Sequence, residues 1–134
     1  MIWADITKLS SYAKSRCRPT PVQVITVFTD GSSKPRKPAM VWKPSQVAEW
    51  QHEVKIVSQG STQVIELVAV NMALSRFKDE PINLVTNSFR VAEIIARLDH
   101  STIKDVENPL LMAELWMLWF LIDQRKHDFY VMHV

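Results

Sequence analysis

Three polar residues of this chain stand where folding could bring them together: Asp30, Glu66 and Asn87. Asp30 and Asn87 each follow an apolar, strand-like run, and Glu66 lies near the start of a helical segment between those runs. In mixed sheets, ligand sites lie at the carboxyl ends of the central strands. Carboxylates gathered there can hold divalent ions, and two such ions about 4 Å apart can bracket an in-line attack on a phosphodiester. A turn aspartate and a first-turn helix charge are the alternative interpretation.

The elements that must position these residues begin with a strand at 22–29, V-Q-V-I-T-V-F-T. It is β-branched and apolar on both faces, which is typical of a central strand. The segments 39–43 and 52–58 predict two further strands, and their short connections predict an antiparallel meander. A helix is predicted over 63–77, with one residue of the preceding S-T pair as its N-cap.

The second half of the chain predicts a strand at 82–86, parallel to the first strand because it follows a helix. Ser88 is the candidate cap of a helix at 89–98. A polar stretch separates that helix from another at about 106–126, and 128–134 reads as the last strand. The prediction is therefore an α/β fold with a five-stranded mixed sheet in the order β-β-β-α-β-α-α-β.

Composition sets limits on the class of protein. The 134 residues fit one domain, and a formal charge of +2 does not demand a polyanionic partner. Local basic clusters fit either a solvated surface or a phosphate-facing patch; they comprise Lys14, Arg16, Arg18, Lys34, Arg36 and Lys37. One cysteine, Cys17, allows no internal disulfide and suits a reducing, intracellular (cytoplasmic) compartment. The longest apolar run, Leu110–Ile122, is too short to span a bilayer, so no membrane partner is expected.

Four motifs resemble those of the RNase H domain of retroviral polymerases, in the right order and spacing. They are T-V-F-T-D-G-S-S at 26–33, I-E-L-V-A-V-N-M-A-L at 65–74, L-V-T-N-S-F-R-V-A at 84–92 and F-Y-V-M-H-V at 129–134. The resemblance is strongest to the betaretroviral or endogenous-retroviral branch. It implies an RNase H-like domain at 22–134, preceded by a connection-like arm or linker at 1–21.

The resemblance also implies hydrolysis of the RNA strand of an RNA–DNA hybrid, with four carboxylates and two magnesium ions. Asp30 would bridge both ions and Glu66 would hold one, but position 87, where the third carboxylate is expected, is Asn. The fourth belongs on a C-terminal helix after the fifth strand, and the sequence stops at Val134. We therefore expect weak or absent magnesium binding and a degenerate, inactive or strongly impaired catalytic site.

Three functions follow as hypotheses. The first is a pseudoenzyme that acts as a structural or protein-interaction module, a homodimer or a complex formed through the sheet face that a C-terminal helix would cover. The helix-like spacing of apolar residues within 1–20, beginning with Ile2 and Trp3, makes that segment another candidate cover. The second is an RNA–DNA hybrid ribonuclease with residual metal-dependent activity. The third is a non-cleaving nucleic-acid binder that uses Lys34, Arg36, Lys37 and Arg90.

Two further features were open to more than one interpretation. The apolar helix at 106–126 predicts either core packing or a protein-binding face. Trp42 and Trp50 are candidates for the core or for stacking on nucleic acid. The glycine of the D-G-S-S turn, Gly31, would allow the backbone to approach a phosphate.

Overall fold

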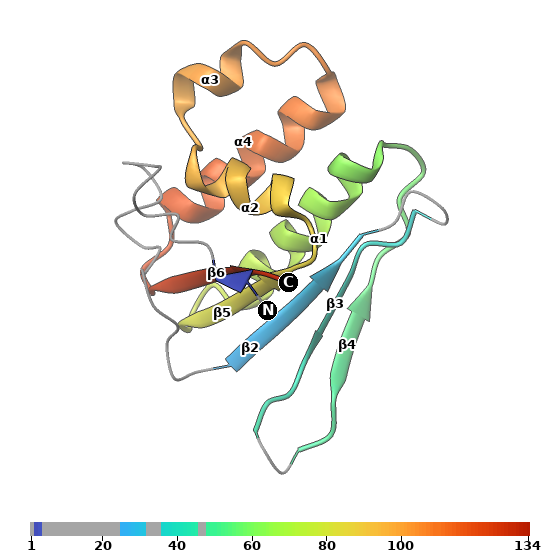
Figure 1. The fold of residues 1–134 in the computed structure, drawn as a ribbon, viewed down its shortest axis with the longest axis vertical. Coiled ribbons are helices and arrows are strands. Elements are labelled where there is room, and N and C mark those ends of the chain that lie inside the picture. The colour runs from blue at the N-terminus through green and yellow to red at the C-terminus, as the bar shows by residue number, and fades with distance from the viewer. Residues whose placement is uncertain (1, 4–24, 32–35, 46–47) are drawn as a thin grey trace.

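The computed structural model describes residues 2–3, 25–31, 36–45 and 48–134 (Figure 1). Most of the predicted arm, including Cys17 and its basic neighbours, lies outside these residues, as does Lys34. No helix in the described ranges is both long enough and apolar enough to cross a membrane.

The structure is built on one six-stranded sheet with the strand order β1-β6-β5-β2-β3-β4. The central strand β2 (Ile25–Asp30) is parallel to β5 (Ile82–Thr86), and β5 is parallel to β6 (Phe129–His133). On its other side β2 pairs antiparallel with β3 (Ala39–Trp42), which pairs antiparallel with β4 (Gln51–Val54). These five strands confirm the predicted mixed sheet, including the parallel pairing of its first and fourth strands.

A sixth strand, β1 (Ile2–Trp3), was not predicted. It pairs antiparallel with β6, with Ile2 opposite His133 and Trp3 opposite Met132. At these two residues the helix-like interpretation was wrong, because they extend the edge of the sheet instead. Extended pairing satisfies backbone N–H and C=O groups that an uncovered edge of β6 would otherwise present to solvent.

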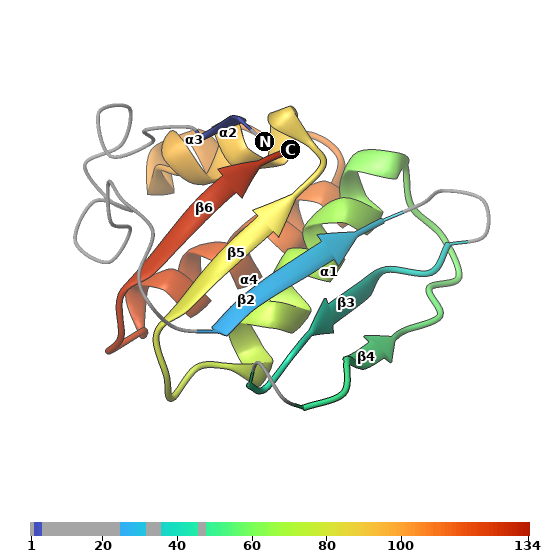
Figure 2. The ribbon, with the colours of Figure 1, turned by 60° about the horizontal axis from the view of Figure 1, so that its bottom comes forward.

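The helices all lie on one face of the sheet (Figure 2). They are α1 (Thr62–Arg76), α2 (Phe89–Ala96), α3 (His100–Lys104) and α4 (Pro109–Asp123). Ser61 and Ser88 cap α1 and α2 as predicted, each hydroxyl accepting a backbone N–H from the first turn. The short α3 was missed, because five residues of polar composition carry too little periodicity to distinguish a helix from a loop.

The core fills the space between the helices and the sheet. Val27, Leu84 and Val131 project from three adjacent strands and are fully buried against helical side chains such as Leu67 and Leu118. Burying such side chains contributes about 1.5–3 kcal/mol each before conformational entropy is subtracted. This layer fixes the strand ends that carry Asp30 and Asn87.

The opposite face of the sheet divides into two halves. On the β5–β6 side, Val85, Tyr130 and Met132 are buried and form a second, smaller cluster. On the β2–β4 side, Phe28 is 37% exposed and Trp50 is 55% exposed, and their rings meet edge to face at 6.0 Å. The two tryptophans in question therefore differ, because Trp42 packs on the helix side and is buried.

Candidate functional site

Asp30 and Asn87 lie side by side because of the register between two parallel strands. Thr29 is opposite Thr86, so the next residue on each strand reaches the same carboxyl edge of the sheet. The Asn87 amide Nδ2 donates a hydrogen bond to Asp30 Oδ1 at 3.1 Å, and both residues are exposed. Ser88 then donates its backbone N–H to Thr86 Oγ1 and caps α2, which holds Asn87 at the turn between strand and helix.

Glu66 is brought to this edge by a close backbone contact at Gly31. A Cβ placed on Gly31 would stand 2.6 Å from the Glu66 backbone nitrogen and 2.7 Å from its Cα, so only glycine lets the turn after Asp30 pack on the first turns of α1. The prediction gave this glycine a role toward phosphate. That role stays a prediction, and the structure adds a packing role that positions Glu66, which is half-buried.

The charge at this edge is small. Asp30 and Glu66 are its two carboxylates among the residues that the structure describes, and no group of three or more His, Cys, Asp or Glu there could hold a metal ion. A carboxylate accepts hydrogen bonds and donates none, so the Asn87 amide nitrogen must face Asp30. An amide oxygen can coordinate a cation, but here the nitrogen end of the group occupies the side toward Asp30.

An aromatic pair borders the strand ends. The Phe89 ring, 58% exposed, meets the His133 imidazole edge to face at 5.4 Å. His133 is in register with Thr86, and its Nδ1 is buried without a hydrogen-bond partner in the described part of the chain. His133 thus lies at the end of β6, at the same edge of the sheet as Asn87.

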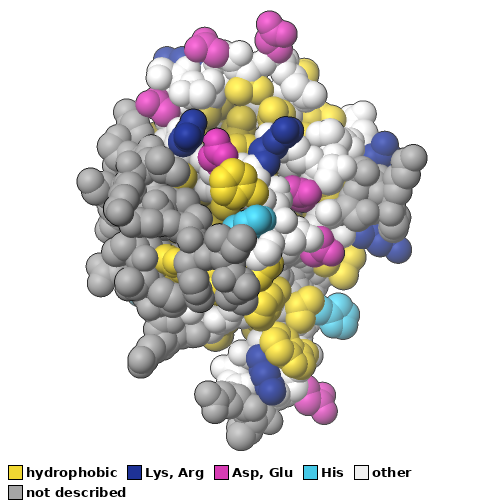
Figure 3. Space-filling view, in the orientation of Figure 1, with side chains coloured by type: hydrophobic (Ala, Val, Ile, Leu, Met, Phe, Trp, Pro, Cys, Tyr) yellow, Lys and Arg dark blue, Asp and Glu magenta, His cyan; other side chains and the backbone are white. Residues whose placement is uncertain are grey.

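The predicted basic residues that the structure describes lie on separate segments, with Arg36 and Lys37 before β3 and Arg90 in α2. Arg36 donates from Nε to the Gly60 carbonyl at 3.3 Å, which ties the β2–β3 connection to the loop before α1. Lys37 and Arg90 are exposed on different elements. On the face in Figure 3, basic and acidic side chains of the described residues are interspersed around exposed apolar groups, and these residues form no continuous basic stripe there.

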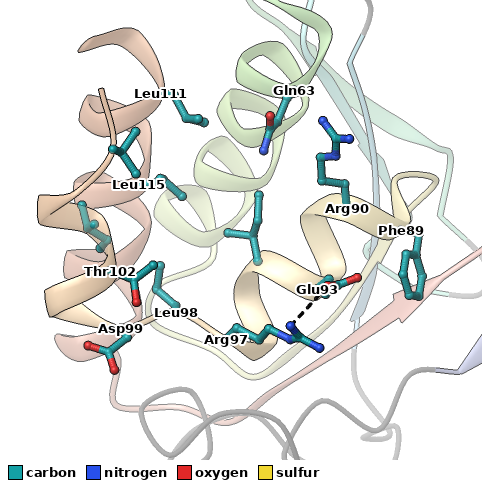
Figure 4. A pocket seen from close by; sticks show the side chains of 13 residues that line it. Gln63, Phe89, Arg90, Glu93, Arg97, Leu98, Asp99, Thr102, Leu111 and Leu115 are labelled. Carbon is teal, nitrogen blue, oxygen red and sulfur yellow. Dashed lines mark ion pairs between the residues drawn. The ribbon is translucent and has the colours of Figure 1, made fainter. Parts of the chain in front are cut away.

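A groove of about 590 Å³ lies among the helices and was not predicted from the sequence. Figure 4 shows Gln63 and Arg90 at one end of it and Asp99 and Thr102 at the other. Its floor is apolar, and on its rim Arg97 pairs with Glu93 at 3.7 Å. The groove depends on α3, whose cap Asp99 accepts from Ser101, and these hydrogen bonds lower the pKa of Asp99.

The comparison with protein families identifies this chain by sequence. The RNase H family model matches residues 22–134. The Gag-Pol polyprotein of Rous sarcoma virus subgroup B (strain Schmidt-Ruppin) is 32% identical over 123 residues, which is 90% of this chain and 7% of the polyprotein. That of avian leukosis virus subgroup A is 31% identical over the same length. The chain therefore spans a small part of these relatives.

Solved structures share the fold. The protease-reverse transcriptase of prototype foamy virus superimposes with a TM-score of 0.68 at 19% identity, over 86% of this chain and 18% of that one. LC11-RNase H1 in complex with an RNA/DNA hybrid gives 0.64 at 16% identity, over 82% and 84% of the two chains. RNase H1 from Halobacterium salinarum gives 0.63 at 19% identity, with the same coverage. Sequence and fold agree that the chain belongs to the RNase H family, as an RNase H domain of the retroviral Gag-Pol type.

Proposed function

We propose that this domain is a catalytically inactive or strongly impaired RNase H-like module of endogenous-retroviral polymerase origin. The observation that carries the proposal is the hydrogen bond from Asn87 Nδ2 to Asp30 Oδ1 at 3.1 Å. At the strand ends where a metal-dependent nuclease needs converging negative charge, a neutral amide donor is directed at one of the two carboxylates.

The physical argument is a charge balance. Among the residues that the structure describes, two divalent ions would meet only the charges of Asp30 and Glu66, and Asn87 would add none. Asn87 would also have to turn its oxygen toward an ion and give up its bond to Asp30. Removing one charge-stabilising group from an active site typically lowers the rate by about 10²–10³. Magnesium binding in the absence of substrate is therefore proposed to be weak or absent, with Asp30 and Glu66 as the residues that would hold any ion.

A cleavage assay tests this proposal. A labelled RNA–DNA hybrid is incubated with the whole chain in Mg²⁺ or Mn²⁺, alongside Asp30→Ala as a matched loss-of-ligand control. We expect the wild-type rate to equal that of the control. Turnover by the wild type that disappears in Asp30→Ala would show a working nuclease and would overturn the proposal.

The role we propose for the module is protein interaction, within the cell, through the open half of the sheet. Phe28 and Trp50 present aromatic surface there, and the Lys43 ammonium lies 5.8 Å from the Trp50 ring centroid. Figure 3 shows apolar groups gathered toward the lower end of the β3–β4 hairpin as seen in that view. Exposed apolar patches of this kind mark interaction sites, and Trp50→Ala should abolish capture of a partner identified by crosslinking through this face.

A second candidate is non-cleaving binding of an RNA–DNA hybrid, favoured by the exposure of Lys37 and Arg90. Binding carried by phosphate contacts weakens steeply as salt rises. A titration of fluorescent hybrid at two salt concentrations, with the double variant Lys37→Ala/Arg90→Ala, separates this candidate from the first. Salt-sensitive binding that the double variant loses would favour this candidate. Binding that changes neither with salt nor in the double variant would contradict it.

A further inference from the structure

The outer edge of the sheet at β4 is longer than the four residues of the strand. Lys55 donates its backbone N–H to the Pro38 carbonyl, and Val57 donates to the Arg36 carbonyl, each at 3.0 Å. The ladder with the neighbouring segment therefore continues from Gln51 to Val57. Every side chain from 51 to 56 is exposed.

The direction of the backbone groups follows from these two bonds. In an antiparallel ladder, alternate residues direct their N–H and C=O groups toward the partner strand. Because Lys55 and Val57 point toward β3, the groups of His52, Val54 and Ile56 point away from it, to the outside of the sheet. Such an edge is a template for pairing with another strand.

We propose that a second copy of this chain pairs with this edge, antiparallel and centred on Val54. In that register Val54 lies opposite Val54 of the second copy, and His52 lies opposite Ile56. Each of these pairs joins outward-facing donors to outward-facing acceptors, as a regular ladder requires. Glu53 then lies opposite Lys55, twice by symmetry, so charge complementarity identifies the occupant as the same sequence.

The side chains at this edge fit the same register. Val54 and Ile56 are large apolar residues that are 50% and 79% exposed, and pairing would cover part of both side chains. Glu53 and Lys55 lie on the helix face, beside Met72 and Arg76 in a groove of about 370 Å³. Neither has an ion-pair partner within the described ranges.

Other registers are less favourable. A shift of two residues in one direction places Glu53 opposite Glu53 of the second copy, and the opposite shift places Lys55 opposite Lys55. Like charges directly opposite each other on a sheet are destabilising. A shift of one residue would place residues whose backbone N–H and C=O groups point outward opposite residues whose groups point toward β3, so the ladder could not form. The alternation of Glu and Lys thus selects the arrangement centred on Val54.

Sedimentation equilibrium of the whole chain over a range of concentrations tests the pairing. The wild type should pass from monomer to dimer as concentration rises. Val54→Pro removes an outward N–H without removing a bond to β3, so it should remain monomeric. Val54→Thr, which keeps the N–H and the branched Cβ, should still dimerise. A wild type that is monomeric throughout, or a dimer unaffected by Val54→Pro, would overturn the proposal.

Charge exchange supplies a second test that does not depend on a proline. Glu53→Lys and Lys55→Glu each place like charges opposite, twice per dimer, so each should raise the dimer dissociation constant about tenfold. An equimolar mixture of the two variants restores both opposite-charge pairs and should form a heterodimer with near wild-type affinity. The double variant should recover as well. If neither the mixture nor the double variant recovers, the register is wrong.

Discussion

Two polar sites differ in burial: the pair at the carboxyl ends of β2 and β5 is exposed, whereas Arg125, which contacts the end of α1, is buried. Asp30 and Asn87 are exposed and are joined by a single hydrogen bond, from Asn87 Nδ2 to Asp30 Oδ1. Arg125 is 3% exposed, and its guanidinium donates to the Phe77 carbonyl at 3.0 Å and to the Glu80 carbonyl at 2.6 Å. The buried group is fixed by several contacts, whereas the exposed pair can change with little effect on folding. A site of this kind can lose a catalytic charge while the domain stays intact.

The largest loss of stability is expected when Arg125 is substituted. Arg125→Ala would leave two carbonyls without their donor and remove the guanidinium from above the Phe129 ring, 5.7 Å from its centroid. Hydrogen bonds to charged groups contribute about 1.5–3 kcal/mol, so we expect the free energy of unfolding to fall by about 3 kcal/mol. Urea unfolding measures this loss, and Asn87→Ala, expected to cost less than about 1 kcal/mol, is the matched control. If Arg125→Ala and Asn87→Ala lower the free energy of unfolding equally, the buried and the exposed site do not differ in their contribution to stability.

A smaller loss is expected at Asn71, the polar contact between α1 and α4. Its Nδ2 donates to the Glu114 carbonyl at 3.0 Å and to Glu114 Oε1 at 3.1 Å, and the residue is 5% exposed. Asn71→Ala removes both of these partly buried hydrogen bonds, which should cost about 2 kcal/mol in urea unfolding. Glu114→Gln keeps an acceptor for the amide and should cost clearly less. If Asn71→Ala is neutral, burial does not set the difference between these regions.

The smallest effect is expected at Asp99, a half-buried residue whose carboxylate caps α3. Its hydrogen bonds with Ser101 lower its pKa below the usual 3.8. The folded pKa is depressed, so this contribution to stability is present above the unfolded pKa and is lost as pH falls through the folded value. The protection factors of the α3 amides, taken against the intrinsic exchange rate at each pH, should therefore fall at acid pH in the wild type. Asp99→Asn, which caps without titrating, should show a smaller fall, and equal profiles would exclude Asp99 as the cause.

The sequence predicted the parts of the fold that local pattern determines. The apolar run at 82–86 and the cap Ser88 were confirmed at the residue, and of the S-T pair before α1 it is Ser61 that caps the helix. Strand burial and capping are short-range effects, so local pattern predicts them. The pairing of β1 with β6 was not predictable, since a two-residue strand exists only through its partner. The short α3 was not predicted, because its five residues carry too little periodicity. The groove beside it was therefore not predicted either.

The candidate site was predicted as a set of positions but not as a set of contacts. The register of β2 and β5 was enough to place Asp30 beside Asn87. Spacing could not show that the Asn87 amide would donate to Asp30, because side-chain orientation depends on the assembled turn. Nor could it show that Gly31 permits the close approach of Glu66. The assignment of Asp30, Glu66 and Asn87 to catalysis therefore stays a prediction.

The central claim is that the amide at position 87 takes the place of an anion that a metal pair requires. Calorimetric titration of Mn²⁺ into the wild type and into Asn87→Asp tests it most directly. We predict that Mn²⁺ binding by the wild type is weak or absent, and that Asn87→Asp raises the affinity at least about tenfold, corresponding to about 1.4 kcal/mol. Two equivalents of Mn²⁺ bound by the wild type, with no gain in Asn87→Asp, would contradict the claim.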